Sequence, residues 1–365
     1  MIRIPIQTRT KSYDVLIEQG LLRSAASHLR ETLPTARHFV IVTAAPIRRH
    51  WGKPLLDSFA SDGARVDVIE MLDGESRKTL STVDDLSTHL VKLKADRNTV
   101  LIALGGGVVG DVTGFLAGIY MRGIRFAQIP TTFLAQVDSS VGGKTGVNLK
   151  VGKNLVGVFK QPELVLVDTE VLSSLPDREY RSGLYESLKA GVIRNPQIFE
   201  FMEQNREKLL AKHPGSLEWL VAESVRLKAE VVGQDEEEHG LRKILNFGHT
   251  IGHALEAETS FKVFLHGEAV AWGMVAAALI AVGMQKTPAE AAQRIIRQVL
   301  AYAPLPKVDV RPKAIFRRLA NDKKTLDGQV HFILPREIGQ VEVVTDVPER
   351  AVLQAVEELR SLSQA

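Results

Sequence analysis

Cysteine is absent from the sequence of 365 residues. This absence excludes disulfides, thiolate metal ligands, cysteine nucleophiles and iron–sulfur clusters, so any metal must be bound by His, Asp or Glu. A strong excess of one charge is also absent, because 46 Lys and Arg stand against 43 Asp and Glu and give a net charge of +3. That excess is too small to indicate a nucleic-acid partner, although it leaves room for a local anion-binding site.

Long apolar runs are absent too. The longest, residues 269–284, falls short of the roughly 20 residues of a membrane span and opens beside His266 and Glu268, so it predicts a buried helix. The first residues lack the continuous apolar core of an export signal. With 45% hydrophobic and 24% charged residues, we expect a globular, cytoplasmic protein of two domains that binds no membrane.

The first half of the sequence alternates short β-branched runs with amphipathic stretches. This pattern predicts a parallel sheet covered by helices on both faces, although the first two runs can instead form a hairpin. The expected strands are residues 2–7, 13–18, 38–43, 65–71, 99–104, 125–129 and 164–167, with helices at 21–33 and 79–94.

After about residue 177 the pattern becomes mostly helical. We therefore expect one domain at residues 1–177 and a second, mostly α-helical domain at residues 178–365. The expected helices of the second domain are residues 179–194, 196–210, 216–232, 246–258, 267–284, 288–301 and 349–362, with a strand pair at 329–334 and 340–344.

A glycine turn follows the expected strand at residues 99–104. Gly105, Gly107 and Gly110 fit the pattern G-x-G-x-x-G, whose backbone amides can approach a pyrophosphate at a helix N-terminus. The match is incomplete because Gln128 stands near the position where an acidic residue is expected. A tight strand–helix turn without a ligand stays open as the alternative.

Two polar loops also indicate anion binding. Residues 73–78 follow an expected strand, at the edge of a parallel sheet where ligands bind. Residues 136–154 contain Gly-Lys-Thr without the spacing of a P-loop, because Asp138 stands where its first glycine belongs. A solvated turn and a flexible surface loop are the respective alternatives.

Three histidines occur within a short stretch. His249 and His253 are four residues apart, which places them on one face of a helix, and His266 opens the next helix. Two histidines and a carboxylate form a common divalent metal site with an open position for substrate. Spacing alone nominates His249 with His253, and leaves the carboxylate open among Glu186, Glu238, Glu256 and Glu268.

Taken together, these motifs resemble the 3-dehydroquinate synthase family of sugar-phosphate cyclases over nearly the whole chain. The matching blocks are Asp73-Gly-Glu-Ser-Arg-Lys78, Leu104-Gly-Gly-Gly-Val-Val-Gly-Asp-Val-Thr-Gly114, Gln128-Ile-Pro-Thr-Thr132, Gln136-Val-Asp-Ser-Ser-Val-Gly-Gly-Lys-Thr145, Gly152-Lys-Asn154, Leu227-Lys-Ala-Glu-Val-Val232, Leu245-Asn-Phe-Gly-His-Thr250, Leu265-His-Gly-Glu268 and Asp322-Lys-Lys324.

The resemblance implies a Rossmann-like NAD-binding α/β domain followed by a helical metal- and substrate-binding domain. It implies a homodimer in the shikimate pathway of aromatic amino acid biosynthesis, with NAD and one divalent metal, Zn²⁺ or Co²⁺. The implied reaction oxidises 3-deoxy-D-arabino-heptulosonate 7-phosphate at C5, eliminates phosphate, reduces the ketone again and closes 3-dehydroquinate by an intramolecular aldol step.

The resemblance also implies roles for single residues. It gives the metal ligands as Glu186, His249 and His266, with His253 as an active-site neighbour, in place of the pair that spacing nominates. The implied catalytic residues are Asp138, Lys144, Lys189, Glu238, Asn246 and His253, and the implied substrate-binding residues are Arg122, Lys144, Lys153, Asn154, Lys189, Lys228, Arg242, Asn246 and Lys324. The implied cofactor-binding residues are Asp73, Gly74, Glu75, Lys78, Gly106, Gly107, Val108, Val109, Gly110, Asp111, Thr131, Thr132, Lys144, Lys153 and Ser174.

The sequence departs from the family pattern at two places. Thr43-Ala44-Ala45 stands where many relatives have an Asp or Asn that holds adenosine, and Tyr185 stands where relatives often have a small residue. Three alternatives were weighed: a cyclase acting on sedoheptulose 7-phosphate, a metal-dependent alcohol dehydrogenase of the glycerol dehydrogenase kind, and a non-catalytic nucleotide sensor. The complete metal set and the many cations favour 3-dehydroquinate synthase.

Overall fold

The computed structural model describes residues 1–60, 63–325 and 330–364, and only the backbone of residues 321–325. The chain forms two compact units. Unit 1 comprises Met1–Pro176 and Lys212–Gly233, and unit 2 comprises Asp177–Ala211 and Gln234–Ala365. The chain first passes from unit 1 to unit 2 between Pro176 and Asp177. The second domain expected at residues 178–365 includes the helix α9, Pro214–Gln234, but nearly all of this helix groups with unit 1.

Unit 1 contains a seven-stranded sheet in the order β1-β2-β9-β6-β5-β3-β4. The strand β1 pairs antiparallel with β2, which confirms the hairpin alternative, and the other neighbours pair parallel. All seven expected strands are present within one residue or so at each end. Their bounds are β1 Ile2–Gln7, β2 Ser12–Ile17, β3 His38–Ala44, β4 Arg65–Met71, β5 Val100–Gly105, β6 Arg125–Pro130 and β9 Leu164–Val167.

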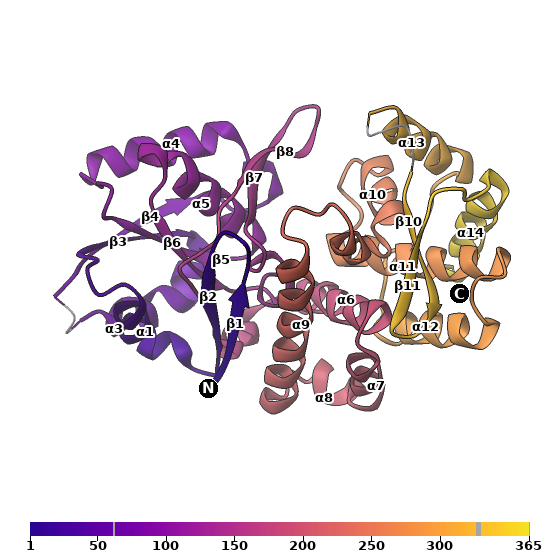
Figure 1. Ribbon diagram of the computed structural model, residues 1–365, viewed down its shortest axis with the longest axis horizontal. Helices are drawn as coiled ribbons and strands as arrows, with labels where there is room; N and C mark the ends of the chain where they lie inside the picture. The colour runs from indigo at the N-terminus through magenta and orange to yellow at the C-terminus, as the bar shows by residue number, and fades with distance from the viewer. Residues whose placement is uncertain (61–62, 326–329, 365) are drawn as a thin grey trace. The chain divides into compact units, whose positions relative to one another are not determined.

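Apolar residues cover both faces of this sheet, as the near-continuous apolar runs of its central strands require. Phe39 and Ile41 of β3 pack in one cluster with α1 (Ala25–Thr32) and α3 (Lys53–Ser58). Val40 and Val42 face the other cluster with α4 (Leu80–Lys92) and α5 (Gly107–Ile119). Figure 1 shows α4 on one side of the sheet and α1 and α3 on the other. The predicted α/β fold of the first half is confirmed.

A second, two-stranded sheet in unit 1 was not expected from the sequence. The strands β7 (Lys144–Leu149) and β8 (Gly152–Phe159) form an antiparallel hairpin within the stretch interpreted as a glycine-rich loop. Glycines permit the close pairing, since a Cβ on Gly157 would lie 2.2 Å from the Thr145 carbonyl oxygen. Short helical segments complete the unit: η1 Leu21–Ser24, α2 Ala45–Ile47, η2 Arg48–Gly52, η3 Glu75–Arg77, η4 Tyr120–Arg122, η5 Ala135–Ser139 and η6 Thr169–Ser174.

Unit 2 is mostly helical, as expected. The predicted helix at 196–210 is interrupted at Asn205, and α13 was not predicted. The predicted strand pair is present, although residue 329 lies outside the described residues. The elements are α6 Asp177–Ile193, α7 Pro196–Gln204, α8 Arg206–Leu210, η7 Leu241–Asn246, α10 His249–Glu258, α11 His266–Gly283, α12 Ala289–Ala301, α13 Pro312–Thr325, β10 Phe332–Glu337, β11 Gln340–Val344 and α14 Glu349–Leu362.

The helix α11 is the central helix of unit 2. It is long and apolar enough by composition to cross a membrane, but 78% of that window is buried inside the protein. Its residues contact α6, α10, α12 and α14, which surround it. The apolar run is therefore a core helix, as the sequence predicted.

Candidate active site

Four predicted site residues of unit 2 come together from three helices. Glu186 lies on α6, His249 and His253 lie on α10, and His266 is the first residue of α11. The ring centroids of His249 and His266 are 5.2 Å apart, and those of His249 and His253 are 5.1 Å apart. One nitrogen from each of the three histidines lies within 4.8 Å of the others. The helices thus gather a cluster of donor atoms that the sequence spreads over residues 186–266.

Hydrogen bonds define which nitrogen of the half-buried His249 and His266 imidazoles faces the cluster. The Nδ1 of His249 lies 3.2 Å from the carbonyl oxygen of Phe247, and the Nδ1 of His266 lies 3.3 Å from Glu256 Oε2. A carbonyl oxygen and an ionised carboxylate only accept hydrogen bonds, so each Nδ1 carries the proton and donates it. The lone pair of each ring is then on Nε2.

Both Nε2 atoms lie near the same carboxylate oxygen. Glu186 Oε1 is 3.9 Å from His249 Nε2 and 3.7 Å from His266 Nε2. Glu186 is only 3% exposed, and this oxygen forms no hydrogen bond with any residue that the structure describes. A buried carboxylate oxygen is costly without a partner. Ligands held at about 2.0–2.2 Å from one Zn²⁺ lie about 3.2–3.6 Å apart in a tetrahedral site, so the three side chains fit a divalent metal.

Two of the other candidate carboxylates are engaged elsewhere. Glu268 accepts hydrogen bonds from Arg178 Nε at 2.7 Å, Arg178 Nη2 at 2.8 Å and the backbone N–H of Leu265 at 2.8 Å. Glu238 accepts from the side-chain amide of Asn246 at 2.7 Å. The Glu268 contacts hold the first turn of α11, where His266 lies, so this residue supports the cluster without facing it.

The electrostatic environment differs between the imidazoles of His249 and His266. Burial lowers the pKa of His249 well below its usual value, and the ammonium of Lys189 and the neighbouring imidazoles lower it further. Burial also lowers the pKa of His266, but the hydrogen bond to Glu256 and the charge of Glu186 outweigh this effect, and its pKa is raised. Lys189, one helical turn after Glu186, forms an ion pair with Glu186 Oε2 and is 3% exposed.

The loop before α10 carries further predicted residues. The carboxylate of Asp235 accepts from the backbone N–H groups of His239 at 2.9 Å, Gly240 at 2.7 Å and Arg242 at 2.9 Å. Arg242 is itself buried and donates to the carbonyl oxygen of Glu236 at 2.5 Å. Asp235 therefore fixes the loop that carries Arg242 and leads to Asn246.

In unit 1, the glycine turn has the close packing that a phosphate-binding turn needs. Gly106 and Gly107 lie between β5 and the first turn of α5, and a Cβ at Gly106 would lie 2.9 Å from Thr132 Cγ2. A Cβ at Gly110 would lie 2.8 Å from Gln128 Oε1. Side chains at these positions would clash with Thr132 and Gln128, so the turn at the N-terminus of α5 needs glycine, as the dinucleotide-binding pattern does. Val108 and Val109 follow in the same turn, and Thr131 donates its N–H to Gly105 at 2.9 Å.

Lys78 connects the predicted cofactor residues with a predicted substrate residue. Its ammonium lies 2.5 Å from Asp111 Oδ2 and 2.5 Å from Asn154 Oδ1, and the side chain is 6% exposed. Asn148 completes the network by donating to Glu75 Oε1 at 2.7 Å and accepting from the Asn154 N–H at 2.9 Å. The predicted loop 73–78 and the β7–β8 hairpin therefore lie together. Asp73 and Gly74, the latter with φ of +98°, form the turn into this loop.

A second buried lysine of unit 1 lies on α9. The ammonium of Lys228 lies 2.6 Å from Asp138 Oδ1 and 2.5 Å from the Asp138 carbonyl oxygen. Asp138 and Lys228 are 90 residues apart in the sequence, and this pair is one of the contacts that join α9 to unit 1.

The structure also gives the positions of four further predicted residues of unit 1. Lys144 begins β7, Lys153 lies on β8, Arg122 ends η4 in a left-handed conformation with φ of 67°, and Ser174 accepts a hydrogen bond from Trp51 Nε1 at 2.7 Å. Lys324 lies where side chains are outside the described residues.

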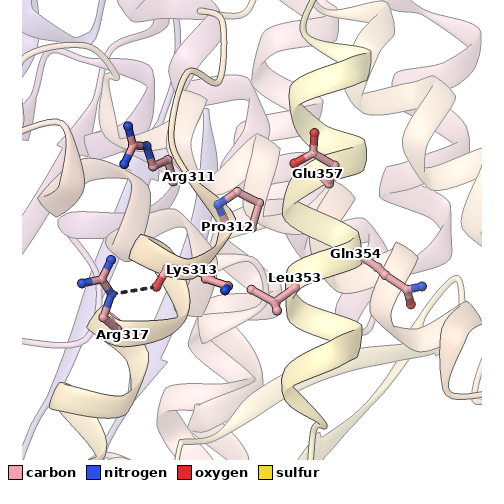
Figure 2. A pocket seen from close by; sticks show the side chains of 7 residues that line it. All are labelled: Arg311, Pro312, Lys313, Arg317, Leu353, Gln354 and Glu357. Carbon is pink, nitrogen blue, oxygen red and sulfur yellow. Dashed lines mark hydrogen bonds between the residues drawn. The ribbon is translucent and has the colours of Figure 1, made fainter.

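Sequence reasoning missed several residues that support the site. Asn148, Asp235 and Arg178 are not in the predicted set, and only long-range contacts with Glu75 and Glu268 reveal Asn148 and Arg178. Asp235 gave one usable signal, since a carboxylate before a turn containing Gly240 is typical of a loop that caps backbone amides. A shallow pocket of about 530 Å³ lies apart from these residues, between α13 and α14, and is lined by Arg311, Pro312, Lys313, Arg317, Leu353, Gln354 and Glu357 (Figure 2).

Comparison with known protein families gives two adjoining matches. Residues 68–182 match the family model described as 3-dehydroquinate synthase N-terminal, and residues 183–325 match the model described as 3-dehydroquinate synthase C-terminal. A 3-dehydroquinate synthase of Koribacter versatilis (strain Ellin345) is 58% identical over 363 residues, which cover 100% of this chain and 99% of that protein.

Solved structures with the same fold include two sugar-phosphate-type cyclases. The 2-epi-5-epi-valiolone synthase of Streptomyces hygroscopicus subsp. jinggangensis 5008, with NAD⁺ and Zn²⁺ bound, has a TM-score of 0.89 at 28% identity and covers 98% of this chain and 99% of its own. A 2-deoxy-scyllo-inosose synthase complexed with carbaglucose-6-phosphate, NAD⁺ and Co²⁺ has a TM-score of 0.88 at 29% identity, with 98% and 99% coverage.

Proposed function

The chain belongs to the 3-dehydroquinate synthase family, and from this premise we propose which of its residues carry the reaction. It is a phosphate-eliminating lyase that converts 3-deoxy-D-arabino-heptulosonate 7-phosphate to 3-dehydroquinate and phosphate, with NAD and one divalent metal as cofactors. When bound, NAD accepts and returns a hydride at the C5 carbon and the metal polarises the substrate hydroxyl groups.

We propose Glu186, His249 and His266 as the metal ligands. The observation that carries this choice is the approach of both Nε2 atoms to Glu186 Oε1, a buried oxygen without a hydrogen bond among the described residues. The three-histidine set that includes His253 has comparable spacing. It leaves the buried Glu186 oxygen without a cation, and His253 is exposed. We therefore propose His253 as a neighbour that contacts the substrate and moves its proton.

We propose that NAD binds on unit 1. The first turn of α5, with Gly106, Gly107 and Gly110, would approach the pyrophosphate through backbone N–H groups. The interlocked side chains Glu75, Lys78 and Asp111 would hold the adjoining sugar and phosphate groups, since Lys78 supplies a buried positive charge. Asp73, Gly74, Val108, Val109, Thr131, Thr132 and Ser174 are proposed to line the same site, with Lys144 and Lys153 near its nicotinamide end.

The substrate carries a phosphate and a carboxylate, which require cations and directed donors. On unit 2 we propose Lys189 and Arg242, which are each 3% exposed and which the fold holds rigidly, with Asn246 as a neutral donor coupled to Glu238. On unit 1 we propose Lys228 and Asn154, with the Asp138 carboxylate beside Lys228 accepting a hydrogen bond from a substrate hydroxyl group. The proposed set of cations is completed by Arg122, Lys144, Lys153 and Lys324.

We further propose that unit 1 is the NAD-binding domain with α9 included, that unit 2 is the metal-binding domain, and that the protein is a cytoplasmic homodimer. The first two proposals rest on where the glycine turn and the histidine cluster lie. The last rests on family membership alone.

Phosphate release tests the proposed function. Protein supplied with NAD and Zn²⁺ should release inorganic phosphate from 3-deoxy-D-arabino-heptulosonate 7-phosphate, a chelator should abolish the release, and added Zn²⁺ should restore it. Sedoheptulose 7-phosphate serves as the parallel substrate. Faster release from sedoheptulose 7-phosphate would instead assign the chain to another activity within the cyclases. Net accumulation of NADH with glycerol would assign it to a dehydrogenase.

A further inference from the structure

The helices α10 and α11 pack antiparallel at unusually short range, and this packing brings one buried carboxylate to the metal cluster. A Cβ at Gly273 would lie 1.8 Å from the Gly248 carbonyl oxygen, and a Cβ at Gly252 would lie 2.9 Å from the Ala269 carbonyl oxygen. One turn farther along α10, the same register places Glu256 beside His266. The close packing of α10 and α11 therefore brings together two residues that lie on different helices.

Glu256 is buried, with 3% of its surface exposed. Its Oε2 lies 3.3 Å from Nδ1 of His266 and accepts a hydrogen bond from it. When the imidazole is protonated, the same contact is also an ion pair. Its backbone carbonyl accepts from the Phe261 N–H at 2.7 Å, which anchors the residue where α10 ends. The burial of Glu256 and its contact with Nδ1 place the carboxylate where it can orient the imidazole ring of His266.

The two proposed histidine ligands are oriented by different acceptors. His249 donates to a neutral carbonyl oxygen, whereas His266 donates to a carboxylate. A carboxylate behind an imidazole fixes its tautomer, raises the basicity of the opposite nitrogen and adds negative charge near the cation. Spacing leaves Glu256 among four candidate carboxylates for the metal, and the family resemblance implies no role for it.

We propose that Glu256 is a positioning residue that holds His266 with Nε2 toward the metal and strengthens metal binding through that ring. This proposal rests on the proposed ligand set, in which His266 binds through Nε2. The proposed effect acts through His266, so it requires no contact between Glu256 and the metal or the substrate. We expect a substitution of Glu256 to lower the metal affinity, and turnover to change only as a consequence of weaker metal binding.

Metal affinity of the metal-free full-length protein provides the test. Co²⁺ or Zn²⁺ is titrated in competition with a chromophoric chelator, and the visible absorption of bound Co²⁺ reports the ligand geometry. We expect Glu256→Ala to weaken metal binding by about 10- to 100-fold and to change the Co²⁺ spectrum. Glu256→Gln keeps an acceptor but removes the charge, so it should weaken binding less than Glu256→Ala and provides the test if Glu256→Ala does not fold.

Glu258→Gln is the matched control. Glu258 lies two residues farther along the same helix and pairs with Arg318 at 2.6 Å. Its carboxylate contacts none of the three histidines among the interactions of the described residues, so replacing it should leave metal affinity unchanged. Wild-type affinity and an unchanged Co²⁺ spectrum in a folded Glu256 variant would overturn the proposal. His266→Ala separates this failure from a failure of the ligand set. If His266→Ala loses the metal while the Glu256 variants keep it, only the positioning role is wrong, and if His266→Ala keeps the metal, the ligand set is wrong.

Discussion

Gly273 of α11 lies against Gly248, the residue that precedes α10, at a distance that no side chain can enter. A Cβ at Gly273 would lie 1.8 Å from the Gly248 carbonyl oxygen and 3.0 Å from the Gly252 backbone nitrogen. Gly248 itself has φ of +80°, which favours glycine. This contact fixes the start of α10, and His249 is the next residue.

Gly273→Ala should therefore destabilise the protein by about 3 kcal/mol and weaken metal binding, because the new methyl group must push α10 away from α11. Unfolding in urea and metal titration measure the two effects. Gly283→Ala is the matched control at the end of the same helix, where a Cβ would meet no atom within 4 Å. There we expect a stabilisation of about 0.5–1 kcal/mol. Equal effects of the two substitutions would contradict the close packing as the cause.

Removing a proposed metal ligand should differ from removing its neighbour. His249→Ala and His266→Ala should each lower Zn²⁺ affinity by at least about 100-fold. Loss of a metal ligand lowers the affinity more than loss of a residue that only orients a ligand. His253→Ala should retain the metal and lose phosphate release. Metal content after dialysis, measured by atomic spectroscopy, distinguishes the variants. Loss of metal from His253→Ala would instead favour the pair that spacing alone nominates.

The Arg178–Glu268 pair should contribute more to stability than a surface pair. Arg178→Ala leaves the 3% exposed Glu268 carboxylate with the Leu265 N–H and without its guanidinium partner, at an expected cost of about 2–3 kcal/mol. Arg318→Ala breaks the Arg318–Glu258 pair, whose side chains are 43% and 30% exposed, and should cost about 0–1 kcal/mol. Urea unfolding of the metal-free protein compares the two. A cost for Arg318→Ala as large as that for Arg178→Ala would show that burial of Glu268 is unimportant.

Asp235 should make the stability depend on pH. Burial raises the pKa of its carboxyl group, but the hydrogen bonds from the Arg242, Gly240 and His239 N–H groups outweigh this effect, and its pKa is lowered. A carboxyl group with a lowered folded-state pKa stabilises the protein above its unfolded-state pKa of about 3.9, and this stabilisation is lost as the pH falls through the folded-state value.

Asp235→Asn should accordingly cost about 1–3 kcal/mol at pH 7, because an amide replaces the charged acceptor of three N–H groups. The difference between wild type and variant should narrow below about pH 4. Urea unfolding at several pH values measures it. A difference that stays constant down to pH 3 would mean that the charge of Asp235 is not what stabilises the loop.

Much of the fold was predictable because its signals are local. The apolar runs of β3, β5 and β9 and the turn after Gly105 define strands and a strand–helix turn within a few residues. The hairpin β7–β8 was not predictable, because its pairing depends on backbone contacts such as that between Gly157 and Thr145. Taken locally, its glycines are typical of a loop. The grouping of α9 with unit 1 rests on long-range contacts, such as those of Lys228 with Asp138 and of Glu218 with the Gln19 N–H, which no periodicity connects.

The site shows the same division. Spacing placed His249 and His253 on one helix face, which is correct, but it did not choose among four carboxylates. That choice depends on long-range geometry: Glu268 faces Arg178, Glu256 faces His266 Nδ1, and Glu186 Oε1 faces both Nε2 atoms. The family resemblance supplied Glu186 where the residues alone left it open.

The chain passes from one unit to the other at residues 176–177, 211–212 and 233–234, and this order bears on how the polypeptide matures during synthesis. Translation delivers the seven strands of the large sheet first, yet the helix that pairs Lys228 with Asp138 emerges only after residues 177–211 have already been made. Within residues 177–211 Glu186 can already pair with Lys189, but the histidines near Glu186, on α10 and α11, are made only after Gln234. Neither unit can therefore finish folding as a simple N-terminal product, and a nascent chain halted between the first and last passages would expose unfinished surfaces of both.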